Sequence, residues 1–148
     1  MRLEATTAID VPPERVLEFF DAIDRHYLEW HPDHISFEWV EGDGLAVGNV
    51  AAFEETIGGE HKQQTVRYTV VDEPSQIELV PTSRLVRLVL PSIRFTIEPR
   101  NGGSRVTQQI RVRTGPIGRR LNRNEFDAVQ QHMDEEAENL KQLLEDGG

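Results

Sequence analysis

The chain has 148 residues, of which 37% are hydrophobic and 28% charged, with no cysteine and a formal net charge of −10. This length favours a single domain, residues 1–148, with a core that needs no disulfide. Without cysteine, any metal ion must be held by histidine, aspartate or glutamate. The acidic charge argues against nucleic-acid and membrane partners, since both are polyanions. No run is long enough to span a membrane and the N-terminus does not resemble a signal peptide, so we expect a cytoplasmic protein.

The first forty residues read as a strand followed by helices. Residues Arg2 to Asp10 alternate loosely, which predicts a strand. The stretch Asp10 to Glu14 combines a capping acid with two prolines, as a helix start does, and the helix is predicted to run to about Asp24. A second helical turn is predicted from Arg25 to Glu29, before Pro32.

The middle of the chain predicts antiparallel strands. The segments are Ile35 to Glu41, Leu45 to Ile57, Gln63 to Val71, Gln76 to Val80, Leu85 to Glu98 and Ser104 to Thr114. Gly58-Gly59 and Asn101-Gly102-Gly103 predict hairpin turns. Pro91, inside the fifth of these segments, indicates a bulge or an edge position.

After Gly115-Pro116 the apolar period becomes helical as far as Glu145. The predicted apolar stripe comprises Leu121, Phe126, Val129, Met133, Ala137, Leu140 and Leu144. This order predicts an α+β fold in which a curved antiparallel sheet of about six to seven strands wraps a long C-terminal helix, with one or two short helices after the first strand. A cavity between sheet and helix is the expected ligand site.

Two polar residues interrupt the apolar side of the last helix. Glu136 projects among the apolar residues, and His132 lies one turn before it. A buried, unpaired carboxylate costs several kcal/mol, so Glu136 requires an arginine or a metal ion. The alternative is a surface His/Glu pair whose stems reach solvent.

Two further segments carry potential ligands. The octapeptide from Tyr27 to His34 contains two imidazoles around a proline, which indicates a site that binds a ligand or metal ion. The alternative is that it forms only an exposed aromatic loop. Glu54 and Glu55 are neighbours on a strand, so one of them faces the cavity, and the strand phase does not decide which. The resulting candidate site for one divalent ion comprises His34, Glu55, His132 and Glu136. Zinc is the best match to this mixture of imidazole and carboxylate ligands.

A basic patch lies near the start of the last helix, from Arg119 to Arg123. We interpret it as paired with the acidic surface, and the alternative is attraction of an anionic substrate to the mouth of a cavity.

The element order resembles the START-like helix-grip fold of the SRPBCC superfamily of Bet v-type proteins. The supporting segments are Asp10 to Val16 at the first helix and Glu135 to Lys141 in the last. Members of this superfamily include lipid and hormone binders, polyketide cyclases and dehydratases, and coenzyme Q-binding proteins.

Within it, the segment Tyr27 to His34 resembles the Tyr-x-x-Trp-His-Pro-x-x-His stretch of the diacetylphloroglucinol and phloretin hydrolases, which use zinc to cleave an acyl group from a phenolic ring. The resemblance implies zinc ligands at His34, Glu55, His132 and Glu136, and a substrate-pocket role for Tyr27. This chain is one residue shorter between Pro32 and His34, which leaves His31 as an alternative ligand. It also has no histidine between His61 and His132, where those enzymes carry a further catalytic one.

We therefore expect a zinc-dependent hydrolase of a small aromatic or acyl-phenolic ketone, in which Tyr27 hydrogen-bonds the substrate. The alternatives are a non-catalytic carrier of a hydrophobic small molecule and a metal-free polyketide cyclase or dehydratase. The expected partner is a small hydrophobic or aromatic ligand, and the sequence is compatible with a homodimer.

Overall fold

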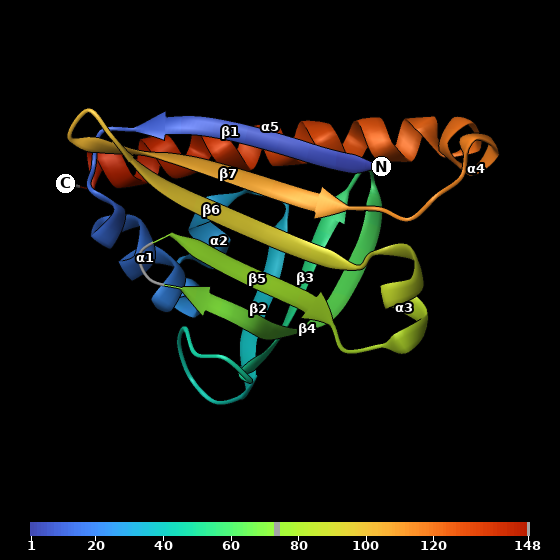
Figure 1. Cartoon of the computed structure of the whole chain (residues 1–148), viewed down its shortest axis with the longest axis horizontal. Helices are drawn as coiled ribbons and strands as arrows, with labels where there is room; N and C mark the ends of the chain where they lie inside the picture. Colours follow the sequence, from blue (N-terminus) through green and yellow to red (C-terminus); the bar gives the residue numbers. More distant parts are fainter. Residues whose placement is uncertain (73–74, 148) are drawn as a thin grey trace.

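The computed structural model describes residues 1–72 and 75–147, which form one antiparallel sheet and five helices (Figure 1). In chain order the elements are β1 (Arg2–Ile9), α1 (Pro13–Asp21), α2 (Ile23–Trp30), β2 (His34–Glu41), β3 (Val50–Ile57), β4 (Glu60–Asp72), β5 (Gln76–Pro81), α3 (Arg84–Val89), β6 (Ser92–Arg100), β7 (Gly103–Arg111), α4 (Pro116–Leu121) and α5 (Arg123–Asp146).

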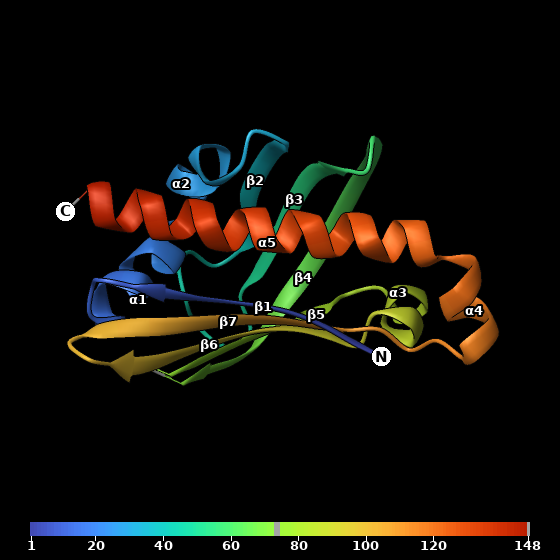
Figure 2. The same cartoon turned by 90° about the horizontal axis from the view of Figure 1, so that it is seen from above.

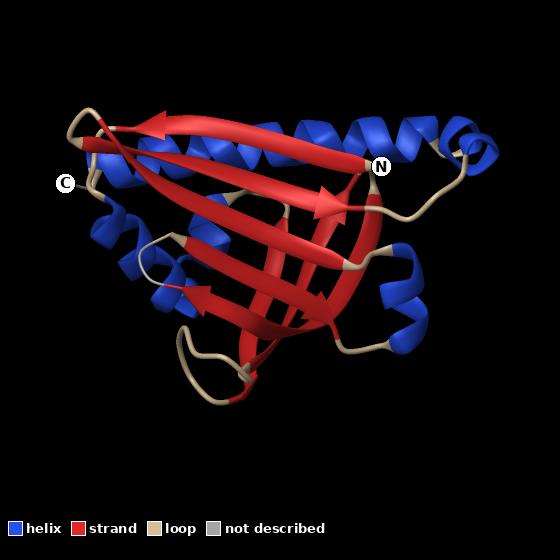
Figure 3. Cartoon of the chain, in the orientation of Figure 1, coloured by secondary structure: helices blue, strands red, loops and turns tan. Residues whose placement is uncertain are grey.

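The seven strands form a single curved sheet in the order β1-β7-β6-β5-β4-β3-β2 (Figure 3). Neighbours along the chain from β2 to β7 pair in sequence, and β1 joins the edge beside β7, with Arg2 opposite Arg111. The long helix α5 crosses one side of this sheet (Figure 2). The predicted α+β helix-grip fold is confirmed.

Sheet and helices enclose an aromatic and aliphatic core. Phe20 and Trp30, from α1 and α2, pack against each other and against Phe95 of β6. The indole N–H of Trp30 donates a buried hydrogen bond of 2.8 Å to the backbone carbonyl of Glu136. This bond fixes α2 against the middle of α5, the helix that carries two of the four candidate ligands, His132 and Glu136.

Two hairpin turns follow the predicted positions. Gly58 and Gly59 between β3 and β4 have φ values of 60° and 80°, and Asn101 and Gly102 between β6 and β7 have φ values of 51° and 81°. Two successive left-handed residues match the twist of antiparallel strands, and glycine and asparagine adopt that conformation most readily.

The prediction of one strand from Leu85 to Glu98 is wrong in its first half, which is helix α3. The hydroxyl of Ser83 accepts a hydrogen bond from the backbone N–H of Val86 at 3.4 Å, as a helix N-cap does. Pro91 then separates α3 from β6.

Other boundaries differ from the predictions. β3 begins at Val50, because Gly48 lies in a turn with φ of 95°. The first helix ends before Ala22, and the C-terminal helix is divided at Asn122 into α4 and α5. Leu121 lies on α4 and is 80% exposed, so it is not part of the apolar stripe. No helix among residues 1–72 and 75–147 has the length and apolar character needed to cross a membrane.

Candidate metal centre and cavity

Four titratable side chains from three elements meet inside the molecule. His34 begins β2 and is the cross-strand partner of Glu55 on β3, while His132 and Glu136 lie one turn apart on α5. One ligand atom from each lies within 4.8 Å of all the others. The structure thus brings together all four residues proposed as ligands from the sequence.

The distances between these ligand atoms match those around a tetrahedrally coordinated metal ion. Nε2 of His34 lies 2.9 Å from Oε2 of Glu136 and 3.5 Å from Oε2 of Glu55. Nε2 of His132 lies 3.2 Å from Oε2 of Glu55 and 3.7 Å from Oε2 of Glu136. Ligand atoms at zinc–nitrogen and zinc–oxygen distances of about 2.1 Å stand about 3.4 Å apart in a tetrahedron. The donor set therefore fits zinc in both chemistry and size.

The hydrogen bond on the far side of His34 sets its tautomer. Its Nδ1–H donates to the backbone carbonyl of Tyr27 at 2.7 Å, because a carbonyl can only accept. In the neutral ring Nε2 is then an unprotonated acceptor facing a carboxylate oxygen of Glu136. Two acceptors at this distance require a proton or a metal ion to join them. Orientation of a metal-binding histidine through its other nitrogen is common in metal sites.

The charges of the cluster are strongly perturbed. Burial raises the pKa of the Glu136 carboxyl, but the hydrogen bonds from His132 and His34 outweigh burial and hold that pKa well below its usual range. Burial lowers the pKa of His132, but the hydrogen bonds and negative charges of Glu136 and Glu55 outweigh this effect and raise the pKa to about 10. Without metal, the cluster therefore contains a buried ion pair between imidazole and carboxylate. A divalent cation could take the place of the proton that joins them.

Tyr27 supports the cluster from α2. Its hydroxyl donates to Oε2 of Glu55 at 3.1 Å, and its ring stacks on the imidazole of His34 with centroids 3.8 Å apart. Burial, followed by the charges of Glu55 and Glu136, raises the pKa of the Tyr27 phenol far above its usual range. The hydroxyl therefore keeps its proton.

The alternative ligands left open by the sequence lie outside the cluster. Nδ1 of His31 accepts the backbone N–H of Asp33 at 2.9 Å, so its Nε2–H donates to Oε1 of Glu135 at 3.0 Å. Glu54 contacts His61 at 2.9 Å on the exposed side of the sheet. His31 and Glu135 do form a second close group with His132, but Glu135 is exposed and neither His31 nor Glu135 lines the cavity.

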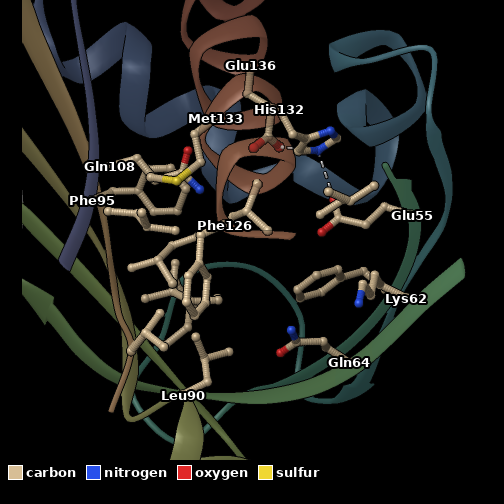
Figure 4. Close-up of a pocket in the computed structure, with 18 of the residues that line it drawn as sticks. Glu55, Lys62, Gln64, Leu90, Phe95, Gln108, Phe126, His132, Met133 and Glu136 are labelled. Carbon is tan, nitrogen blue, oxygen red and sulfur yellow. Dashed lines mark hydrogen bonds and ion pairs between the residues drawn. The ribbon is translucent and has the colours of Figure 1, made fainter. Parts of the chain in front are cut away.

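The cluster faces one end of an internal cavity of about 520 Å³ (Figure 4). Glu55, His132 and Glu136 line it, whereas His34 lies behind them with no exposed side chain. Most of the wall is apolar and comes from the sheet and α5, including Phe53, Leu79, Ile93, Phe95, Phe126, Val129 and Met133. This volume suits a small organic ligand, since ligand pockets span about 300–1,000 Å³.

Sequence reasoning did not identify the polar residues along β4. Lys62, Gln64 and Tyr68 all line the cavity, and Oε1 of Gln64 is buried without a hydrogen-bond partner among the described residues. Their even spacing from residue 62 to residue 68 is the signal that places them on one face of a strand. Lys62 Nζ also bridges Glu60 and Glu125, at 3.0 Å and 2.9 Å, which connects β4 to α5.

The family model described as "Polyketide cyclase / dehydrase and lipid transport" matches residues 1–145. A search of curated proteins gave no match.

Several solved structures share the fold. Protein TTHA0849 from Thermus thermophilus has a TM-score of 0.76 at 18% identity, covering 100% of this chain and 99% of its own. The Zhui aromatase/cyclase from Streptomyces sp. R1128 has a TM-score of 0.73 at 15% identity, covering 98% and 93%. Protein Ms6760 from Mycobacterium smegmatis has a TM-score of 0.72 at 20% identity, covering 99% and 92%.

Proposed function

The chain belongs to the polyketide cyclase/dehydrase and lipid transport family, and from this premise we propose that it is a zinc-dependent hydrolase of a small aromatic or acyl-phenolic ketone bound in the cavity. The observation that carries the proposal is the buried cluster of two imidazoles and two carboxylates at the end of an apolar cavity. Two carboxylate oxygens and two ring nitrogens converge on one point there, and this is a donor set that suits a tetrahedral zinc ion.

In this proposal His34, Glu55, His132 and Glu136 hold the ion. A zinc ion held there supplies Lewis acidity toward a carbonyl oxygen and lowers the pKa of a bound water. The chain's own residues orient the ligand and control protons. Phe53 and the other apolar wall residues position an aromatic ring and exclude bulk water, and Tyr27 keeps a proton on its hydroxyl beside Glu55. The net reaction adds water across the bond between acyl carbon and ring carbon, giving a carboxylic acid and a phenol.

A metal-free role is the second candidate. The family description and the neighbour named an aromatase/cyclase favour a cyclase, dehydratase or carrier that binds a polyketide-like ligand. The predominantly apolar wall of the cavity suits that ligand class equally well.

Metal analysis of tag-free protein separates these candidates. We expect about one equivalent of zinc in the wild-type chain, its loss in His132→Ala, and its retention in His61→Ala, a control in which the replaced imidazole contacts Glu54 outside the cluster. Wild-type protein that binds no zinc, or a His132→Ala variant that retains it, would overturn the metal site.

The reaction is tested separately by incubating zinc-loaded protein with a monoacylated phloroglucinol and measuring release of the carboxylic acid. Zinc binding without cleavage of acylphenols would refute the hydrolase and favour the carrier.

A further inference from the structure

The arginines of this acidic chain are concentrated at one end of the molecule. Six of the fourteen lie in or beside α3 and α4: Arg84, Arg87, Arg113, Arg119, Arg120 and Arg123. Residues 82–92 and 112–124, which contain all six, include no aspartate or glutamate, although the whole chain has 26. We call these two segments the arginine-rich rim.

These six side chains are not neutralised within the protein. No ion pair or side-chain hydrogen bond of any of them occurs among residues 1–72 and 75–147, where the arginines that do pair with carboxylates are Arg2, Arg15, Arg67 and Arg94. The interpretation that the patch from Arg119 to Arg123 pairs with the acidic surface is therefore wrong. Its positive charge remains available to an external partner.

The rim also carries the most exposed apolar side chains. Leu85 on α3 is 78% exposed, and Ile117 and Leu121 on α4 are 77% and 80% exposed. The complete set of exposed large apolar residues on the rim is Leu85, Val86, Leu88, Val89, Ile117 and Leu121. All of these side chains are aliphatic. On the two short helices α3 and α4 they therefore lie among unpaired guanidinium groups.

The cavity opens at this rim. Among the residues that line the cavity, the exposed ones are Val89, Arg113, Asn122 and Glu125, all of which lie at the end of α3 or around α4. The backbone N–H of Arg113 donates to the carbonyl of Val89 at 2.7 Å and joins the two rim segments. In Figures 1 and 2, α3 and α4 lie at the same end of the molecule, opposite α1 and the C-terminus.

We propose that the arginine-rich rim docks on an anionic lipid membrane, with the mouth of the cavity facing the lipid. The guanidinium groups contact lipid phosphates, and the aliphatic side chains enter the headgroup region, as on amphipathic membrane-surface helices. An apolar ligand can then pass from lipid to cavity without crossing water.

A membrane suits these observations better than an acidic protein. Arginine is common to both kinds of surface, but interfaces between proteins are also enriched in aromatic residues and methionine, and the rim has neither. Basic residues beside exposed leucine side chains on a helix are typical of membrane-surface helices. The overall charge of −10 does not prevent docking, because at physiological salt the repulsion from distant acids is screened beyond about 8 Å. The inference does not depend on the metal site.

The test is sedimentation with vesicles of phosphatidylcholine alone and of phosphatidylcholine mixed with phosphatidylglycerol. We expect binding to the mixed vesicles only, and weaker binding as salt is raised. The variant Arg119→Ser/Arg120→Ser is compared with Arg25→Ser/Arg100→Ser, which removes the same charge at exposed positions outside the rim. The rim variant should bind the mixed vesicles about 30-fold more weakly, at about 1 kcal/mol for each arginine, and the control should bind as the wild type does.

A second variant separates lipid insertion from charge alone. Leu85→Ser/Leu121→Ser keeps every arginine and changes only exposed side chains, so it should fold normally and still lose vesicle affinity. Equal weakening in both arginine variants, or no binding of the wild type to the mixed vesicles, would overturn the proposal. Binding to an acidic protein matrix but not to vesicles would also overturn it, in favour of a protein partner.

Discussion

Replacing Glu136 with glutamine tests the cluster most directly, because the change preserves shape and removes one charge. Glu136 is 5% exposed, and Oε2 lies 2.9 Å from His34 and 3.7 Å from His132. Breaking a buried ion pair costs about 3–5 kcal/mol. We expect the lower end, since His132, whose pKa is raised in part by Glu136, can release a proton once this carboxylate is gone. At about 2–4 °C per kcal/mol for a chain near this size, metal-free Glu136→Gln should melt about 6–12 °C below the wild type.

The change in Tm on adding zinc is the second measurement in the same assay. A hundredfold excess over Kd stabilises a protein by about 2.7 kcal/mol, which corresponds to about 5–11 °C in Tm. We expect this upward shift in the wild type and little or none in Glu136→Gln. The control is Glu138→Gln, an exposed position on the same helix whose carboxylate accepts a hydrogen bond from Gln142 at 3.3 Å and from no other residue in the described part of the chain. Differential scanning fluorimetry with chelator or with zinc measures both effects. The reasoning fails if Glu136→Gln melts like the wild type without metal, or if zinc shifts both proteins equally.

Three further changes have defined outcomes. Tyr27→Phe removes the hydroxyl that donates to Glu55, and loss of such a supporting hydrogen bond should weaken zinc binding about 10–100-fold in a chelator competition; an unchanged affinity would contradict the supporting role. In metal-free protein, the pKa of His132 is raised from 6.5 to about 10 by Glu136 and Glu55 against the effect of burial, so its contribution to the free energy of unfolding is complete below pH 6.5 and is lost as the pH rises through 10. Urea unfolding in chelator should show this decline, and His132→Gln should flatten it. Gln64→Leu removes a buried oxygen that has no partner in the described residues and should raise the free energy of unfolding by about 1 kcal/mol; a lower Tm would show that the oxygen is satisfied in solution.

The sequence predicts the order of strands and helices well where glycine and asparagine residues indicate the turns. Gly58-Gly59 and Asn101-Gly102 both lie at hairpins with positive φ, because few other residues tolerate that conformation. The segment from Leu85 to Val89 was misassigned, since a short run rich in leucine and valine satisfies a strand pattern as well as a helical one. The cap at Ser83 and the break at Pro91 distinguish the two, and both residues are visible in the sequence.

The candidate site was only partly accessible from the sequence. Helical spacing placed His132 and Glu136 together, but it could not choose between Glu54 and Glu55, because neighbouring strand residues differ only in which face they occupy. Pairing of His34 with Glu55 across β2 and β3 resolves that choice in the structure. Such a register depends on contacts distant in sequence, which no local pattern encodes.

The positions of the rim and the cluster along α5 constrain the ligand. Glu125 lies at the mouth and His132 at the candidate metal centre, and the helix between them rises by about 10 Å. A single aromatic ring with a short acyl group fits entirely within that depth, whereas a longer alkyl chain must extend through the mouth between α3 and α4. The aliphatic side chains at the mouth, including Val89, would then contact that chain, and the arginines would stay in contact with lipid phosphates. Entry with the acyl end first brings the carbonyl to Glu55 and His132 without the ligand turning inside the cavity. Under the two proposals, a ligand that entered from a membrane in this way would present its reactive end to the buried imidazoles and carboxylates.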